Sequence, residues 1–309
     1  MQIFYLSNRP TVLAGTIDAV TRWMPWVTSA VVVAPPKMLF TSSDRLPVTV
    51  IDEAELSGHS SAELKAMDHV TRNVTLRRAA LPHLDDSFIL SDDDYRPLTH
   101  VGLDNFVDDR GRHKRYWFYK LEDWPDRRTD YDKAQIRTLS ALRLLGSPTR
   151  AYGAHMPQIM NRAMLTEVFK QSDEVGAGAL IDEWSLYFNL APLNHPLAFA
   201  DPEPFQTLAW PEWPHQWPHQ VAPHPIRFEN HYPAHEAPGG LFHSLPAVTE
   251  PDGPLARIEA WRTAELAIGE LRFDPAWNDP WTQGKPVKRG IFSALRLVSK
   301  VGKYIGLGR

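Results

Sequence analysis

The sequence has no cysteine in 309 residues. Disulfides, thiolate catalysis and cysteine-ligated zinc are therefore excluded, and the composition fits a reducing compartment. No apolar run approaches the roughly 20 residues that a membrane-spanning helix needs. The first residues, MQIFYLSNRP, lack the basic start and the long apolar run of a signal peptide. We therefore expect a cytoplasmic protein.

A large excess of charge of either sign is also lacking. The chain has 33 Lys and Arg residues and 37 Asp and Glu residues, so its formal net charge is −4. A chain with this balance has no overall basic character, and we expect no nucleic-acid partner. Proline and tryptophan, in contrast, are abundant, with 27 and 11 residues. Both concentrate in the C-terminal half, which indicates long ordered loops there.

The N-terminal part of the chain alternates short apolar runs with stretches of helical periodicity. The resulting β-α-β-β-α-β order predicts an α/β domain with a mostly parallel sheet flanked by helices. Ligands of such sheets bind at the carboxyl ends of the strands. The expected strands cover 2–6, 29–36, 48–51 and 87–91, and the expected helices cover 16–26, 60–84, 131–145, 161–172, 181–191 and 253–273.

Composition divides the chain into three parts. Residues 1–190 carry the α/β pattern, residues 191–279 are rich in Pro, Trp and His before they return to a helix, and residues 280–309 form a basic tail. The tail has no acidic residue after Asp279, and its apolar residues form a stripe. A basic amphipathic helix of this kind either binds an anionic membrane surface or packs on the domain with its basic face in water. Peripheral contact with the inner membrane surface is therefore one of two expectations.

Three consecutive aspartates, Asp92, Asp93 and Asp94, directly follow the apolar run SFILS. Adjacent carboxylates repel one another, so a cation is expected near them. Mg²⁺ or Mn²⁺ in phosphate chemistry is held by one or two carboxylates and by the phosphates of the substrate. The triad contains the Asp-x-Asp pattern of nucleotide-sugar transferases, and it lacks the glycine and the later acidic residue of a calcium EF-hand. The alternatives are a solvated turn or a helix cap.

The surrounding sequence extends this pattern. The run HVTRNVTLRRAALPHLDDSFILSDDDYRPLTHVGLDNFVDDRGR resembles the second conserved region of the Stealth family of bacterial sugar-phosphate transferases. The segments TIDAVTRWMPWVTSAVVVAPP and HMPQIMNRAMLTEVFKQ are similar to neighbouring regions of that family, so the resemblance covers roughly residues 15–190. It implies a GT-A-like (Rossmann-type) catalytic domain at 1–190, a nucleotide-sugar donor such as a UDP- or GDP-hexose, and a divalent metal.

One departure from the family directs the choice of reaction. The family's first strand carries a Trp-Val-Asp-Gly-type motif, whereas IFYLSNRP has no acidic residue. We therefore expect plain glycosyl transfer from a nucleotide-sugar to an oligo- or polysaccharide acceptor, as in polysaccharide biosynthesis. The alternatives are transfer of hexose 1-phosphate and a non-catalytic carbohydrate-binding protein on the same scaffold.

Residues after the first strand, and arginines before the triad, are candidates for holding the donor. GT-A proteins cradle the nucleotide after their first strand, and an arginine there binds a diphosphate bidentately. Three arginines also precede the triad, but at their helical spacing they cannot all face one ligand. The donor candidates are Tyr5, Ser7, Asn8, Arg9, Arg72 and Arg77, with Arg78 as the third arginine.

The resemblance also places acceptor and catalytic residues. An acid at the depth of Asp182 or Glu183 lies beneath the acceptor in GT-A enzymes, where it serves as a general base or orients the acceptor. A carboxylate at a helix N-terminus is the structural alternative. His155, which opens the HMP segment, is an acceptor contact, a metal ligand or a hydrogen-bonding residue at a helix entry.

The Pro/Trp/His-rich region supplies the remaining candidates. GT-A enzymes recruit a C-terminal histidine as an extra metal ligand, and His231 or His243 is the choice here. Flat aromatic rings stack on sugars, so Trp210, Trp213 and Trp217 are expected to shape an acceptor groove, or else to pack beneath a Pro-rich loop.

Overall fold

The structure is a computed structural model that describes residues 1–36, 38, 46–124, 129–208, 225–231, 233–240 and 242–271. These residues fall into two compact units. The first contains Met1–Thr207 and the described residues up to Glu229, and the second contains Leu208 and the described residues from Asn230 onward. The predicted residues Trp210, Trp213 and Trp217 and the basic tail at 280–309 lie outside the described residues.

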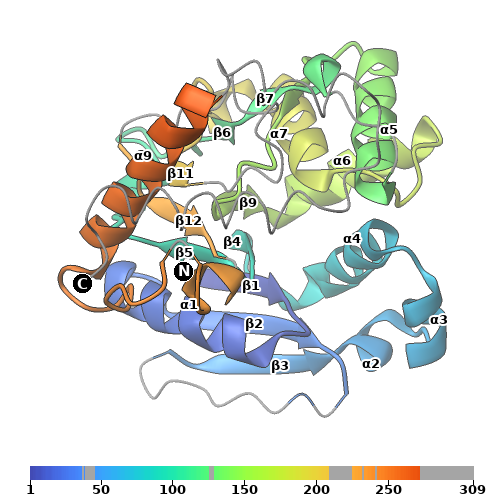
Figure 1. Cartoon of the computed structure of the whole chain (residues 1–309). Helices are drawn as coiled ribbons and strands as arrows, with labels where there is room; N and C mark the ends of the chain where they lie inside the picture. Colours follow the sequence, from blue (N-terminus) through green and yellow to red (C-terminus); the bar gives the residue numbers. More distant parts are fainter. Residues whose placement is uncertain are drawn as a thin grey trace, which may run out of the picture. The chain divides into compact units, whose positions relative to one another are not determined.

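A five-stranded sheet forms the centre of the first unit (Figure 1). Its strands run in the order β3-β2-β1-β4-β9, and the first four are parallel, whereas β9 runs antiparallel to β4. The predicted α/β class with a mostly parallel sheet is therefore confirmed. The strands are β1 (Gln2–Leu6), β2 (Ser29–Ala34), β3 (Val48–Asp52), β4 (Ser87–Asp92) and β9 (Gln158–Asn161).

The first helix, α1 (Pro10–Trp23), begins earlier and ends earlier than the sequence predicted. Pro10 stands at its first position, where the missing N–H costs nothing and the fixed φ suits a helix. Pro25 disfavours helical geometry at Met24, whose φ of −129° and ψ of 60° end the helix. The buried face of α1 includes Ile17 and Val20, which are fully enclosed.

The single helix expected over 60–84 is two helices in the structure. Ser60 caps α3 (Ser61–Ala66) in a capping box with Glu63. Asp68 then caps a new helix, α4 (His69–Ala80), by accepting a hydrogen bond from the Thr71 N–H at 2.8 Å. The start of α4 was not predicted, because the helical periodicity continues across the short break between α3 and α4.

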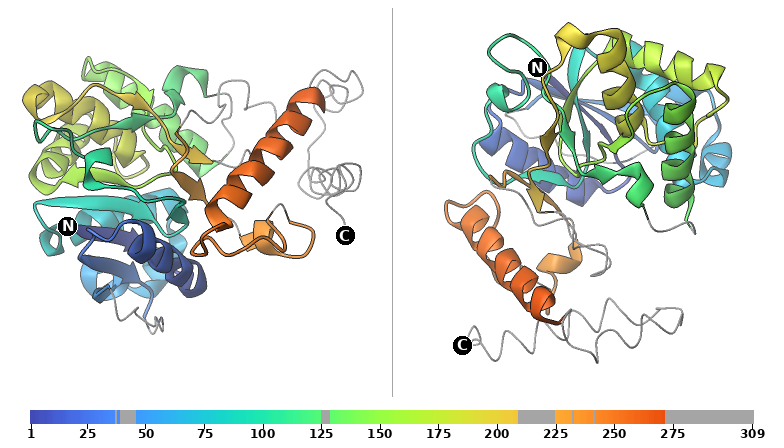
Figure 2. Two further views of the ribbon diagram at one scale, coloured as in Figure 1. Left: turned by 90° about the vertical axis from the view of Figure 1, so that its left-hand side faces the viewer. Right: turned by 90° about the horizontal axis from the view of Figure 1, so that it is seen from above.

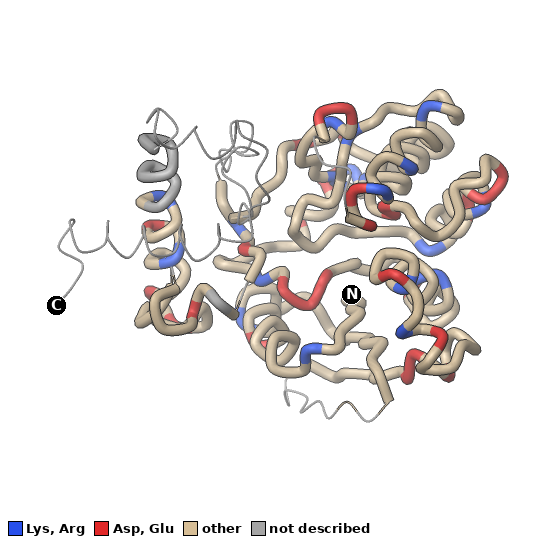
Figure 3. Tube along the Cα trace, turned by 45° about the vertical axis from the view of Figure 1, so that its right-hand side comes forward, with Lys and Arg blue, Asp and Glu red and all other residues tan. Residues whose placement is uncertain are grey.

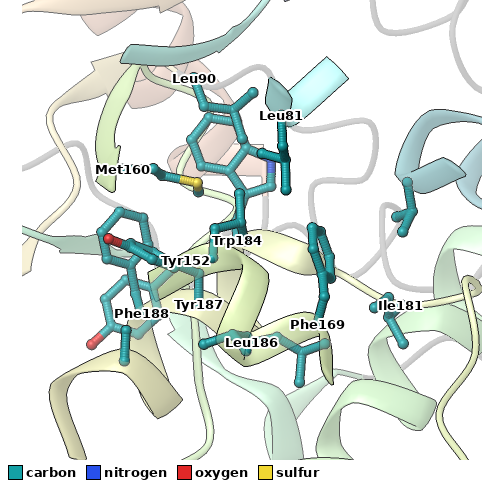
Figure 4. Close-up of a cluster of buried hydrophobic side chains, with 14 of the residues drawn as sticks. Leu81, Leu90, Tyr152, Met160, Phe169, Ile181, Trp184, Leu186, Tyr187 and Phe188 are labelled. Carbon is teal, nitrogen blue, oxygen red and sulfur yellow. The ribbon is translucent and has the colours of Figure 1, made fainter. Parts of the chain in front are cut away.

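Three helices gather beside β9 (Figures 1 and 2). They are α5 (Asp130–Leu144), α6 (Arg162–Glu174) and α7 (Glu183–Asn194), close to the predicted ranges. Helix α7 is buried over most of its length, and it packs against both α5 and α6. The Trp184 indole lies between Leu81, Leu90 and Met160 in the hydrophobic core (Figure 4), which fixes the first turn of α7.

Short elements complete the described chain. The short helices are α2 (Glu53–Ser57), η1 (Leu81–His83), η2 (Leu103–Asn105), η3 (Leu121–Asp123) and η4 (Pro196–Ala198). The short strands are β5 (Tyr95–Pro97), β6 (Tyr116–Trp117), β7 (Tyr119–Lys120), β8 (Arg150–Ala151), β10 (Glu203–Pro204), β11 (Thr207–Leu208) and β12 (Phe228–Asn230). No helix among the described residues is long and apolar enough to cross a membrane.

The second unit contains α8 (Pro233–Glu236) and α9 (Gly253–Leu271), and α9 confirms the helix predicted near the end of the extension. Arg257 on α9 donates to the Glu236 carboxylate at 2.7 Å and lies 5.0 Å from the centre of the Phe242 ring. His235 packs edge-on against the same ring. Phe242 is therefore enclosed by one side chain from each helix.

Lowering the pH from 7 to 5 is expected to weaken the second unit by about 2 kcal/mol through His235. Burial, followed by the nearby Arg257 charge, lowers the pKa of His235 to about 4. Below pH 6.5, His235 is protonated in the unfolded chain but stays neutral in the folded chain. The free energy of unfolding therefore falls as the pH falls. Urea unfolding at both pH values should show the loss, and His235→Gln should reduce it. An equal loss in that variant would contradict the assignment, and His243→Gln, at an exposed position, is the control.

Candidate functional site

A polar pocket lies at the carboxyl ends of the parallel strands. The strand order reverses at β1, because β2 and β3 lie on one side of it and β4 lies on the other. Such a reversal leaves a crevice outside the strand ends, where ligands of α/β sheets bind. The pocket there has a volume of about 280 Å³. It is lined by Leu6, Ser7, Asn8, Arg9, Val33, Glu53, His69, Arg72, Asn73, Leu76, Asp92, Asp93 and Asp94.

Asp93 joins the end of β1 to the end of β4. Its carboxylate accepts hydrogen bonds from the Ser7 hydroxyl at 2.5 Å and from Arg9 Nε at 3.2 Å, and the other oxygen pairs with Arg9 Nη2. Its backbone carbonyl accepts from the Thr16 hydroxyl of α1 at 2.6 Å. Asp93 is only 3% exposed. Both carboxylate oxygens are thus occupied by protein donors, as expected for a residue that holds the strand ends together.

Asp94 and Asp92 differ from Asp93 in exposure and in partners. Their side chains are 14% and 35% exposed. One oxygen of Asp94 pairs with Arg9 Nη2 at 2.9 Å, and one oxygen of Asp92 pairs with Arg77 Nη2 at 2.5 Å. Burial and repulsion from Asp92 raise the pKa of Asp94 to about 7, against the opposing effect of Arg9. The fold therefore holds the Asp94 carboxylate where negative charge is disfavoured unless a cation is near.

Arg77 is buried between the triad and helix α7. Its guanidinium, 7% exposed, pairs with Asp92 on one side and with Glu183 on the other. The Glu183 side chain is 4% exposed. Neither residue lines the pocket. Arg77 was predicted to contact the donor and Glu183 to contact the acceptor. The structure instead places both behind the triad, where they form an ion pair with each other.

The three arginines of α4 are separated as their helical spacing predicted. Arg72 lines the pocket and pairs with the buried Glu53 of α2. Arg77 lies beneath the triad, and Arg78 pairs with Asp173 on α6 at 2.9 Å. The pocket wall also contains Glu53, His69 and Asn73, which were not predicted from the sequence. Positions 69, 72, 73 and 76 form one face of a helix, but that signal is informative only once the end of β1 is known to lie opposite.

Tyr5 and Asp182 lie outside the pocket lining. Tyr5 is fully buried within β1, and burial together with the Asp93 charge raises the pKa of its hydroxyl. Asp182 caps α7, accepting hydrogen bonds from the Ser185 hydroxyl at 2.5 Å and from Gln135 Nε2 at 3.4 Å. Burial raises the pKa of the Asp182 carboxyl. Asp182 thus occupies the helix-cap position that was the structural alternative for it.

His155 has an unusual backbone conformation. Its φ is 51°, in the left-handed region that costs a residue with a side chain about 1–3 kcal/mol. Its ring packs edge-on against Tyr95 and Phe118, with centroids 5.9 and 5.4 Å away. Burial lowers the pKa of His155 to about 4, and the nearby Asp92 charge opposes this shift. His155 therefore stands close to the triad as a neutral imidazole at pH 7.

The remaining predicted metal ligands belong to the second unit. His231 is buried there, with Nδ1 3.8 Å from a Glu236 carboxylate oxygen, and His243 is exposed. Within the part of the chain that the structure describes, no group of three or more His, Cys, Asp or Glu side chains is placed to hold a metal ion. At any one place, the described residues therefore supply at most two metal ligands from Asp, Glu or His side chains.

Charge at the triad agrees with one divalent cation. The carboxylates of Asp92, Asp93, Asp94 and Glu183 face two guanidinium groups, those of Arg9 and Arg77. Each carboxylate has a guanidinium partner, but four acids share two arginines, so the cluster has a net charge of −2 when all four acids are ionised. Acidic and basic positions are otherwise interspersed along the described trace (Figure 3). The donor set also fits, because Mg²⁺ commonly takes one or two carboxylates and completes its shell with water and phosphate oxygens.

The fold and pocket define an α/β protein with an acidic, arginine-lined crevice at the reversal of its strand order. Neither the family models nor the curated proteins include a match to the chain, so membership of the Stealth family is not shown. Among solved structures, the chain is similar to the apo form of mouse xyloside xylosyltransferase 1, with 11% sequence identity and a TM-score of 0.40. The similarity covers 75% of this chain and 98% of that one. At this identity and TM-score, it says nothing about activity.

Proposed function

We propose that the chain is a GT-A-like, metal-dependent glycosyltransferase that moves a hexose from a nucleotide-sugar to a saccharide acceptor. The observation that carries the proposal is the pocket at the reversal of the strand order, where two partly exposed carboxylates meet an arginine and polar side chains. That combination suits a ligand with a diphosphate and hydrogen-bonding groups.

The donor nucleotide would occupy this pocket. The pocket has a volume of about 280 Å³, near the lower end for small-molecule sites. We therefore propose that it holds the nucleotide and leaves the sugar outside. Arg9 is half-exposed at the rim; its Nε and Nη2 are engaged by Asp93 and Asp94, so Nη1 is the atom that would donate to a diphosphate oxygen. Asn8 and Asn73 offer both donors and acceptors to the nucleoside.

Asp92 and Asp94 would hold the Mg²⁺ or Mn²⁺ ion, without Asp93, whose oxygens already accept protein hydrogen bonds. When bound, such an ion neutralises charge on the departing nucleoside diphosphate. Arg9 keeps Asp93 and Asp94 in place from the β1 side, and Arg77 keeps Asp92 in place from the α4 side. The chain's own part is thus to orient two carboxylates toward one point.

On the acceptor side, we propose that His155 contacts the acceptor. We also propose that neither Asp182 nor Glu183 takes part in proton transfer. His155 is neutral at pH 7 and lies beside Tyr95 near the triad. Asp182 and Glu183 are both buried and engaged by Ser185 and Arg77. A carboxylate held this way cannot reach an acceptor hydroxyl without losing its partners.

Thermal unfolding with a panel of nucleotides tests the proposal. UDP, GDP, ADP and CMP, with their hexose conjugates, are each added with and without Mn²⁺. At 100 times Kd, a ligand adds about 2.7 kcal/mol, which raises Tm by roughly 5–10 °C in a unit of this size. We expect this shift with one nucleotide and only with Mn²⁺.

Asn73→Ala should reduce the nucleotide-dependent shift, whereas Thr75→Ala, on the same helix but outside the pocket lining, should retain it. No shift with any nucleotide would overturn the proposal and favour the non-catalytic carbohydrate-binding protein. A product that carries phosphate on the transferred sugar would instead favour transfer of hexose 1-phosphate.

A further inference from the structure

Glu183 lies behind Arg77, the ion-pair partner of Asp92, and does not line the pocket. Arg77 pairs with Asp92 at the end of β4 and with Glu183 at the start of α7. Both ends of this bridge belong to regular elements, and both Arg77 and Glu183 are almost completely buried. The bridge is therefore part of the rigid core and not a surface ion pair.

The Glu183 end of the bridge is fixed independently of Arg77. Asp182 caps α7 through Ser185, which sets the direction of the helix. Trp184 is packed in the core between Leu81, Leu90 and Met160 (Figure 4). The Arg77 guanidinium also lies 6.0 Å from the Trp184 ring. Glu183 therefore cannot follow Arg77 toward the triad, and it holds the guanidinium at a set distance.

The position of Arg77 matters because its charge competes with any cation at Asp92. A guanidinium paired with Asp92 alone would neutralise that carboxylate. A second carboxylate on the far side of the guanidinium offsets its charge and keeps Asp92 negative. Glu183 supplies that second carboxylate from a buried site, where screening by water is weak.

We propose that Glu183 is a positioning residue that acts through Arg77 to orient Asp92 and to keep its charge available for a divalent cation. This inference rests on the proposed function, since it takes Asp92 and Asp94 as the cation ligands. It assigns Glu183 a part in cation binding without contact to the donor or the acceptor.

Direct Mn²⁺ binding, measured by electron paramagnetic resonance of free Mn²⁺ with UDP or the nucleotide found above, tests the inference without an activity readout. Glu183→Gln keeps the shape of the side chain and removes its charge, and we expect a roughly tenfold weaker Mn²⁺ affinity. Glu183→Asp keeps the charge and should stay within about threefold of the wild type. Asp173→Asn, which removes the partner of neighbouring Arg78, is the matched control and should not change the affinity.

A double-mutant cycle separates action through Arg77 from a general effect of charge. In the Arg77→Met background, Glu183→Gln should change Mn²⁺ affinity by less than about twofold, because the link to Asp92 is already gone. Equal losses in both backgrounds, or no loss in the wild-type background, would overturn the inference while the cation site stands.

Failure of the cation site itself looks different. If the wild-type chain binds no Mn²⁺ with any nucleotide, the metal-dependent function fails, and the inference fails with it. Should Glu183→Gln not fold, Arg77→Lys gives the same test. Lysine lacks the planar fork that bridges two carboxylates, so a roughly tenfold loss of Mn²⁺ affinity is again expected, and an unchanged affinity in that variant would overturn the inference.

Discussion

Asp94→Ala is expected to lower glycosyl transfer by about a thousandfold, the size seen when one electrostatic contact to a developing charge is removed. The unfolding temperature should stay the same or rise. The pKa of Asp94 is raised because burial and Asp92 disfavour its charge, so the fold gains nothing from ionising it. Initial rates at saturating donor, together with a thermal melt, measure both effects.

Two variants serve as controls for Asp94→Ala. Asp109→Ala, at an exposed position away from the pocket, should leave transfer unchanged. Asp93→Ala should instead destabilise the first unit by about 2–4 kcal/mol, because Ser7 and Arg9 lose their buried acceptor. Near-normal transfer by Asp94→Ala would contradict the assignment of Asp94 to the cation.

Arg77→Met is expected to destabilise the first unit by about 3–5 kcal/mol. The substitution leaves the Glu183 carboxylate buried without its ion-pair partner, and a charge in that state costs far more than the pair contributes. Urea unfolding should show the loss as a lower midpoint with an unchanged slope.

The double variant Arg77→Met with Glu183→Met should regain most of that loss. It removes the stranded charge and replaces it with apolar volume, which is often neutral for a buried pair. Arg78→Met, whose partner Asp173 is half-exposed, should cost no more than about 1 kcal/mol. Equal losses for Arg77→Met and the double variant would show that the buried pair is not the source of the instability.

Local features of the sequence predicted much of the first unit. The apolar runs gave correct positions for β1, β2 and β4, because a buried parallel strand needs an almost continuous apolar segment. The run at β3 was also placed correctly, although this edge strand is only partly buried. The acidic run after the fourth of these was predicted at a strand end, and the structure places it there. Helix boundaries were less well predicted, since Asp68 starts a new helix within an uninterrupted periodic pattern.

The roles of individual charged residues were not readable from the chain. The three aspartates of the triad are chemically identical, yet Asp93 is enclosed by Ser7 and Arg9 while Asp92 and Asp94 border open space. Arg72, Arg77 and Arg78 are close neighbours on one helix, yet they face the pocket, the core and α6. Side-chain direction along a helix rotates by 100° per residue, so the surroundings decide each role.

By itself, the sequence determined the α/β class, the parallel strands and an acidic end to the fourth strand, because these depend on local periodicity and composition. Only the tertiary structure decided that β1 lies beside β4, which brings Arg9 to the triad and opens the pocket. It also decided that Glu183 faces Arg77 and not an acceptor. Such pairings join segments far apart in the chain, and they follow from how the helices and strands pack, which no local pattern encodes.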